Sequence, residues 1–373
     1  MESHRRLLAA AGHRVRVVAG RGDCELIPEL DSRHPEVEAL TDLLAAGEDV
    51  RDSFESLSSR IGEAIAGPLR DSDLVIAHNV MTMPFNLPLT AALARSGTPV
   101  LAWTHDLAWT NPRYAAFHRE GFPYRMLREP APGVRYAAIS ERVRRQLEST
   151  LDIGAEVVPN GVDRLALLRV RQSTRDLLGP TGIFEADPLI LVPFRVTTRK
   201  RLETAIAAAG IAAAELPGLK LVVSGPLGPH SRANSDYWAR LSELTRQLEL
   251  TERVIFLHEL GDPHPVDDEM IAELYQLAAA VLLTSESEGF GLPVLEAGLA
   301  RVPVVCSDLD VFREVAGEMA WTFPVDASAT IVAEVLHLAL STKQAKLQSR
   351  IRERYDWHHV LPMVETEIKF ALG

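Results

Sequence analysis

Two residue types are scarce in this chain of 373 residues: cysteine and lysine. Cys24 and Cys306 are the only cysteines, which excludes a disulfide framework or a cysteine-based zinc cluster and suits a reducing compartment. Of the 39 basic residues five are lysines, which leaves 34 arginines. We attribute this skew to genome composition rather than to function.

Long apolar runs are absent as well. None approaches the roughly 20 residues that a membrane-spanning helix needs, and the first residues are polar rather than signal-like. We therefore expect a soluble, cytoplasmic protein. The net charge of −12 argues against a nucleic-acid partner. The histidines show no metal-ligand spacing, and the chain contains no internal repeat.

What the sequence does contain is a regular alternation of apolar, strand-like stretches with helix-like ones. This pattern predicts parallel sheets covered by helices, and the length is sufficient for two domains with proper cores. In the first half we expect strands at 13–20 and 134–140, a strand followed by a loop at 74–79 and at 99–106, and helices at 6–12, 87–96 and 141–148, the last capped by Ser140. Residues 35–66 are expected to form one long or broken helix, and 155–163 to end the first half in a Pro-Asn-Gly turn. In the second half we expect strands at 189–194, 219–225, 253–257, 280–284, 302–306 and 319–323, and helices at 201–214, 234–248, 268–277, 292–300, 311–315 and 357–372.

The chain is organised around residues 280–306, AVLLTSESEGFGLPVLEAGLARVPVVC. Two apolar strands flank a glycine-rich loop and a helix, so the loop directs backbone N–H groups toward an anion at the helix N-terminus. Glu288 precedes the glycines, and Glu296 stands about one turn inside the helix, roughly 6 Å beyond the anion position. That is about the distance from a diphosphate to its ribose. A nucleotide-sugar fits this layout.

The stretch EGFGLPVLEA resembles the E-x7-E signature of retaining glycosyltransferases of the GT-B fold, the large "group 1" family. The resemblance implies a donor site built from Glu288, Gly289, Phe290, Gly291, Leu292 and Glu296. Without the family pattern, the same stretch would be an acidic loop that only caps a helix.

A second constellation is FRVTTRK, residues 194–200. It resembles the family's Arg-x4-Lys pair, which implies that Arg195 and Lys200 hold the donor diphosphate. Fixed cations stabilise a departing nucleoside diphosphate because its negative charge grows in the transition state. With two cations in this role we expect no metal and no cofactor. Arg199 and Arg201 are expected to face solvent.

Other positions match the family less closely. Ser224 and Gly225 end a predicted strand, where the family packs backbone near the donor, and His105 follows a strand near which the family often has a donor- or acceptor-contacting histidine. His78 and Asn79 are weaker candidates for the same cleft, and Asn160 is expected to make a turn. Arg142, Arg144 and Arg145 could face anionic lipid, but a solvated helix face explains them more simply.

The resemblance implies two doubly wound, Rossmann-like parallel-sheet domains facing a cleft. We expect an acceptor-side domain at 1–163, a donor-binding domain at 164–355 and a helix at 356–373 that crosses back to the first domain. The first strand and glycine-rich loop that the family places before AAAGHRVRVV are absent from the sequence. We therefore expect either a start codon assigned too late or a truncated gene with an impaired acceptor-side domain.

The predicted function is transfer of a hexose from a nucleotide diphosphate sugar to an acceptor hydroxyl, with retained anomeric configuration. The acceptor is a small molecule, a glycan or a lipid-linked molecule, and the sequence does not distinguish these. Two alternatives remain open: a GT-B sugar-nucleotide epimerase, and a nucleotide-sugar-binding protein that has lost turnover.

Overall fold

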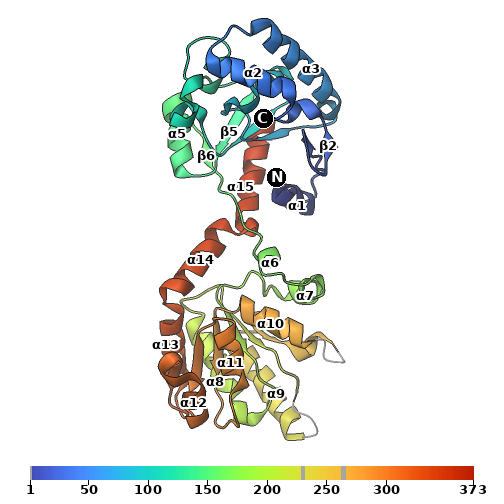
Figure 1. Ribbon diagram of the computed structural model, residues 1–373. Helices are drawn as coiled ribbons and strands as arrows, with labels where there is room; N and C mark the ends of the chain where they lie inside the picture. The colour runs from blue at the N-terminus through green and yellow to red at the C-terminus, as the bar shows by residue number, and fades with distance from the viewer. Residues whose placement is uncertain (1, 228–231, 262–265) are drawn as a thin grey trace. The chain divides into compact units, whose positions relative to one another are not determined.

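The computed structural model describes residues 2–227, 232–261 and 266–373. These residues form two compact units, shown in Figure 1. Unit 1 comprises Met1–Asp163 together with Arg354–Gly373, and unit 2 comprises Arg164–Glu353. The chain thus enters unit 2 once and returns to unit 1 with its last helix.

Unit 1 is built on a parallel sheet of four strands in the order β3-β4-β5-β6. Helices cover both faces of the sheet. Alternate residues of a strand point to opposite faces, so each strand contributes to two cores. Val100 and Ala102 of β4 belong to one core, and Leu101 and Trp103 to another that includes residues of α1 and α15. The strands are β3 (Val75–His78), β4 (Val100–Thr104), β5 (Val134–Ala138) and β6 (Glu156–Val157); the helices are α1 (Glu2–Ala10), α2 (Pro35–Ala46), α3 (Arg51–Arg70), α4 (Leu87–Arg95), α5 (Glu141–Leu151) and α15 (Trp357–Leu372).

The start of unit 1 differs from the sequence prediction. The strand expected at 13–20 is wrong for most of its length: only β1 (Val18–Ala19) is a strand. It pairs with β2 (Glu25–Leu26) in a separate two-stranded sheet. No residue of 13–20 is fully buried, so this basic and apolar stretch gains too little burial to form a sheet strand of that length. Residues 35–66, expected to form one long or broken helix, form a broken one: Gly47, with φ +85°, ends α2, and α3 begins at Arg51.

Unit 2 is built on a parallel sheet of six strands in the order β12-β11-β10-β7-β8-β9. Its first strand, β7, is internal with later strands on both sides, as in a doubly wound sheet. The strands are β7 (Leu189–Val192), β8 (Lys220–Val223), β9 (Val254–Phe256), β10 (Ala280–Leu283), β11 (Val304–Ser307) and β12 (Trp321–Phe323); the helices are α6 (Arg164–Leu167), α7 (Gln172–Leu178), α8 (Leu202–Ala212), α9 (Arg232–Gln247), α10 (Asp268–Leu277), α11 (Leu292–Leu299), α12 (Asp310–Ala316), α13 (Ala329–Leu340) and α14 (Lys343–Tyr355). Four of these helices, α6, α7, α13 and α14, were not predicted.

Candidate functional site

The site residues predicted in the second half of the chain lie at the carboxyl edge of the unit 2 sheet. The loops after β7, β8 and β10 carry Arg195, Ser224 and Glu288 respectively. A short 3-10 helix, Thr198–Lys200, follows the first of these loops. The carboxyl edge of a doubly wound sheet is where such folds bind their ligands.

Lys200 and Glu288 form an ion pair at the centre of this edge. The Lys200 ammonium contacts Oε1 of Glu288, and the two side chains are 7% and 10% exposed. The ammonium also lies 3.7 Å from the centre of the Phe194 ring, a cation–π contact. Burial lowers the pKa of Lys200, and the Glu288 carboxylate opposes that shift. The sequence predicted both residues for the site but not their pairing.

Hydrogen bonds to two backbone carbonyls join the two segments that carry this pair. The Thr284 hydroxyl donates to the Lys200 carbonyl at 2.7 Å, and the Glu286 N–H donates to the Arg199 carbonyl at 2.9 Å. These two bonds hold the loop after β10 against the 3-10 helix. Within the loop, the Ser285 hydroxyl donates to Glu288 Oε1 at 2.7 Å and so helps to orient that carboxylate.

The two arginines near the pair behave differently. Arg199 was expected to face solvent, and it is exposed, but it also contacts the loop after β10. Its side chain is 52% exposed, but Nη1 lies 3.5 Å from Glu288 Oε2 and donates to the Ser287 carbonyl at 3.2 Å. Arg195 is exposed and has no partner among the residues that the structure describes. Its guanidinium is thus available to an anion.

The glycine-rich loop leads into α11. Gly291 is the N-cap with φ +97°, a left-handed conformation that favours glycine, and Pro293 occupies the first turn of the helix. A Cβ at Gly291 would also lie 3.1 Å from the Phe312 ring. Gly289 is exposed, and the side chains of Phe290 and Leu292 are 56% and 59% exposed. The loop and the helix N-terminus therefore face outward, as an anion site requires.

Glu296 lies on the exposed side of α11, and Tyr275 fixes its carboxylate. The Tyr275 hydroxyl, from α10, donates a hydrogen bond of 2.5 Å to Glu296 Oε2. Burial and the nearby Glu296 charge raise the pKa of Tyr275. The sequence predicted Glu296 but gave no signal for Tyr275.

Ser224 and Gly225 close the loop after β8 against the loop after β7. Ser224 is 2% exposed, and the N–H of Gly225 donates to the Phe194 carbonyl at 3.1 Å. A Cβ at Gly225 would lie 2.4 Å from that carbonyl oxygen. Glycine is therefore required here by the close approach of two backbones, beside any contact with a ligand.

His105 lies in unit 1, in the loop after β4. The Asn79 side-chain oxygen accepts from the backbone N–H groups of His105 and Asp106, each at 3.1 Å. Asn79 therefore shapes the His105 loop. The His105 ring lies 6.3 Å from that of His78, between ring centres. Asn160, expected only to make a turn, also accepts from the Trp103 indole at 3.4 Å.

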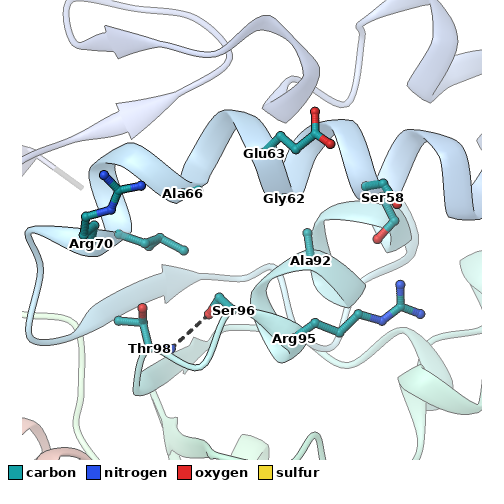
Figure 2. Close-up of a pocket in the computed structure, with 11 residues that line it drawn as sticks. Ser58, Gly62, Glu63, Ala66, Arg70, Ala92, Arg95, Ser96 and Thr98 are labelled. Atoms are coloured by element: carbon teal, nitrogen blue, oxygen red, sulfur yellow. Dashed lines mark hydrogen bonds between the residues drawn. The ribbon is translucent and has the colours of Figure 1, made fainter.

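Unit 1 has a pocket of about 580 Å³ between α3 and α4. Figure 2 shows it lined by small and charged residues, among them Gly62, Ala66, Ala92 and Arg95. Arg95 is engaged by Glu55 at 2.7 Å. Because Arg70 and Thr98, which precede β3 and β4, also line the pocket, it lies toward the amino ends of these strands. It contains no predicted site residue.

The described residues contain neither a candidate metal site nor a candidate membrane-spanning helix. Among the residues that the structure describes, no group of three or more His, Cys, Asp or Glu could hold a metal ion. In the same part of the chain, no helix is both long and apolar enough to cross a membrane.

The fold and the site define an α/β protein with two parallel sheets and a candidate ligand site at the carboxyl edge of the second. Two family models match the chain: "Glycosyl transferases group 1" over residues 174–355, and "Glycosyltransferase Family 4" over residues 2–164. The chain belongs to the group 1 glycosyltransferases. The GT-B fold class expected from the sequence is confirmed, with a doubly wound parallel sheet in unit 2 and a parallel sheet covered on both faces in unit 1.

Individual relatives share limited sequence with the chain. The serotype-specific mannosyltransferase WbdA of Escherichia coli is 40% identical over 93 residues, which are 25% of this chain and 11% of the relative. Mannosylglucosylglycerate synthase of Thermotoga maritima is 23% identical over 342 residues, 84% of this chain and 77% of the relative. Among solved structures, Anabaena HepE in complex with UDP has 17% identity and a TM-score of 0.38, covering 84% of this chain and 82% of its own.

Proposed function

We propose that this protein transfers a hexose from a nucleotide diphosphate sugar to an acceptor hydroxyl, with retention of the anomeric configuration. One observation carries the proposal: unit 2 gathers two candidate phosphate-binding cations, Arg195 and Lys200, with the outward-facing loop Gly289–Gly291 and the carboxylates Glu288 and Glu296, at a single sheet edge. Membership of the glycosyltransferase family supports it.

Each residue has a role in this proposal. The diphosphate lies at the N-terminus of α11, where backbone N–H groups and the helix dipole favour an anion. Arg195 and Lys200 stabilise the leaving diphosphate, and Glu296 accepts from the ribose hydroxyls. When the diphosphate is bound, Lys200 interacts with it as well as with Glu288. The weaker hold on Glu288 lets its carboxylate turn toward the sugar. Ser224 and Gly225 bring backbone close to the donor.

The acceptor hydroxyl attacks the same face of the sugar that the diphosphate leaves, and the leaving phosphate takes the hydroxyl proton. This front-face path accounts for retention, and no protein carboxylate needs to act as the base. His105 of unit 1 contacts the donor or the acceptor. We propose that the reaction needs no metal, and that it takes place in the cytoplasm on a small-molecule, glycan or lipid-linked acceptor.

Incubation with a panel of radiolabelled nucleotide-sugars and an acceptor mixture tests the proposal. Transfer of label to an acceptor, with the anomeric proton coupling of the donor kept in the product, supports it. Recovery of an epimerised donor would establish the epimerase instead. Binding of a nucleotide-sugar without any product would establish a binding protein.

A further inference from the structure

We propose that Tyr275 is a positioning residue that holds the Glu296 carboxylate in the orientation that receives the donor's ribose hydroxyls. The inference rests on the proposed function, because it assigns to Tyr275 a part in the ribose contact of the same site. It goes further by placing the origin of ribose selectivity on a buried side chain of a neighbouring helix, α10, that has no contact with the donor of its own.

The contact itself is specific. A tyrosine hydroxyl has one proton to donate, and the Tyr275 proton goes to Glu296 Oε2 at 2.5 Å. Tyr275 is 3% exposed, whereas Glu296 is on the exposed side of α11. A buried donor thus holds an exposed acceptor. Without it, the free glutamate would sample several rotamers, and ordering them would cost part of the binding energy.

The Tyr275 hydroxyl keeps its proton at neutral pH and can therefore donate it. Burial in the core raises the pKa of its hydroxyl, and the Glu296 carboxylate raises it further. The hydroxyl is therefore un-ionised at neutral pH. Because Tyr275 holds one carboxylate oxygen, Glu296 has fewer rotamers available, and its other oxygen can still accept.

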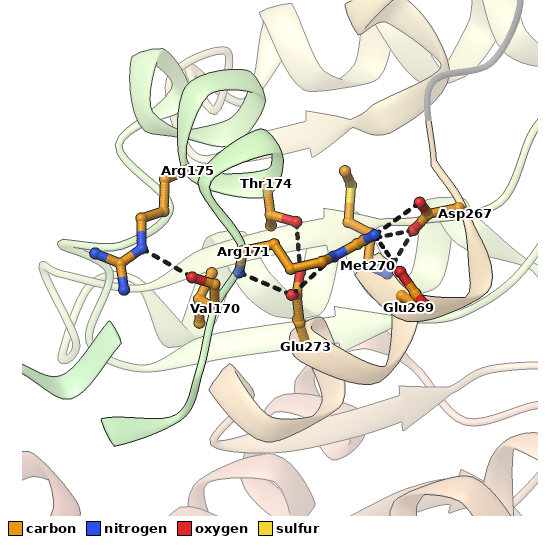
Figure 3. A network of polar contacts seen from close by, with 8 residues as sticks. All are labelled: Val170, Arg171, Thr174, Arg175, Asp267, Glu269, Met270 and Glu273. Carbon is orange, nitrogen blue, oxygen red and sulfur yellow. Dashed lines mark hydrogen bonds and ion pairs between the residues drawn. The ribbon is translucent and has the colours of Figure 1, made fainter. Parts of the chain in front are cut away.

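The helix that carries Tyr275 is itself anchored, as Figure 3 shows. Glu273 of α10 accepts from the backbone N–H of Arg171 at 2.9 Å, from Arg171 Nε at 3.1 Å and from the Thr174 hydroxyl. Asp267 caps α10 through the Met270 N–H at 2.7 Å and pairs with Arg171 Nη2 at 2.6 Å.

Two positions along a helix correspond to about 200° of rotation. Glu273 therefore faces α7 on one side of α10, while Tyr275 faces α11 on the other. The polar network shown in Figure 3 anchors α10, and α10 in turn positions Tyr275 next to Glu296. The Tyr275 hydroxyl is thus placed by rigid elements rather than by a loop, which gives it the fixed geometry that positioning requires.

Tyr275→Phe tests the inference because it keeps the buried ring and removes only the hydroxyl. The probes are UDP, GDP and ADP, each compared with its 2′,3′-dideoxy counterpart by titration calorimetry. For the base that binds best, the variant should lower the preference for the ribonucleotide about 3- to 10-fold, the range for one hydrogen bond. Affinity for the dideoxy form should stay within about twofold.

The same tyrosine substitution, made in a variant that lacks the Glu296 carboxylate, distinguishes a positioning role from a role in core packing. In Glu296→Ala, which removes the acceptor and itself should lower the ribonucleotide preference, adding Tyr275→Phe should cause no further loss of preference. Equal losses for ribo- and dideoxynucleotide in the Tyr275 variant, or an unchanged preference, would overturn the inference. Tyr124→Phe is the matched control: it removes a buried hydroxyl that donates to the Leu44 carbonyl in unit 1, and nucleotide binding should not change.

The test also distinguishes failure of the inference from failure of the proposed function. If Glu296→Ala leaves the ribonucleotide preference unchanged, the ribose assignment of Glu296 is wrong, and the role given to Tyr275 fails with it. If none of the three nucleotides binds, the proposed function itself fails. If Glu296→Ala changes the preference and Tyr275→Phe does not, the inference alone is wrong.

Discussion

Lys200 and Glu288, 88 positions apart in the chain, form an ion pair in which both side chains are about nine-tenths buried. The pair joins the segment after β7 to the loop after β10. It also means that a carboxylate compensates the charge of the lysine that the proposed function assigns to the donor phosphate. Under that proposal a diphosphate must compete with Glu288 for the ammonium, whereas the exposed guanidinium of Arg195 is open to it.

Removal of one partner of this pair should destabilise unit 2. We expect Glu288→Gln to lower the free energy of unfolding by about 3–5 kcal/mol, because a buried ammonium would lose its counter-charge. Lys200→Met combined with Glu288→Leu should recover much of that loss. Urea unfolding followed by circular dichroism measures both changes.

Glu243→Gln is the control for that measurement. Glu243 forms an exposed i,i+3 pair with Arg246, and such solvent-screened pairs contribute little to stability. If Glu288→Gln costs no more than the control, the ion pair does not stabilise the unit. If the double variant is no better than the single one, burial of the charge is not the cause.

Glu296→Ala should chiefly weaken donor binding. Loss of a hydrogen bond from a charged group is worth about 1.5–3 kcal/mol, so the donor dissociation constant should rise ~10- to 150-fold. Titration calorimetry with the nucleotide-sugar measures it. Glu318→Ala, at an exposed carboxylate after α12, should leave the constant unchanged. An unaltered constant in a folded Glu296 variant would remove the ribose assignment.

Arg195→Ala should lower turnover more than it raises the Michaelis constant. Its guanidinium is assigned to charge that grows as the diphosphate departs, and loss of one such donor costs about 10²–10³ in kcat. Steady-state kinetics resolve the two constants. Arg142→Ala on α5 should leave both unchanged, since Arg142 is exposed in unit 1. A rise in the Michaelis constant alone would assign Arg195 to ground-state binding.

Activity should survive an excess of chelator. In the proposed mechanism, fixed guanidinium and ammonium groups carry out the electrostatic stabilisation that a divalent ion supplies in other transferases. Transfer rates measured with and without 10-fold excess EDTA over total divalent ions should agree. Loss of activity that magnesium or manganese restores would contradict the metal-free mechanism.

The sequence could predict which residues reach the site, but not how they pair there. Apolar runs located β7 and β10, so the loops that carry Arg195 and Glu288 followed from the rule for strand ends. The Lys200–Glu288 contact depends on how two distant loops pack, and no local pattern encodes that. Tyr275 looked like any aromatic residue on a helix.

The error at 13–20 has a different physical cause. Alternation of basic and apolar residues satisfies the pattern for a half-buried strand, but a strand also needs a neighbour, and only Val18–Ala19 found one. Pairing partners are a tertiary property. The missed α13 and α14 show the same limit: α14, largely charged, reads as helix or as loop until its packing is known.

The last prediction concerns acid stability of unit 1. The rings of His4 and His78 lie 4.9 Å apart between centres, and His4 packs edge-on against Trp103 and Trp357. Burial lowers the pKa of His4 to about 4 and that of His78 to about 3. The neighbouring His105 lowers both further, and burial lowers its own pKa.

Because these pKa values lie below the 6.5 of an unfolded histidine, the unfolded chain binds more protons than the native unit between about pH 6.5 and pH 4. The free energy of unfolding should therefore be fully present above pH 6.5 and decrease as the pH falls through this window. His4→Leu removes one of these titrating groups while keeping an apolar contact with the two tryptophans, so the decrease between pH 7 and pH 5 should be smaller. Urea unfolding at the two pH values measures it, with His358→Gln, at an exposed position of α15, as the control. A histidine held neutral in the core must contribute to the loss of unfolding free energy on acidification. If that loss is equal in wild type and His4→Leu, His4 does not contribute, and another group governs the acid response.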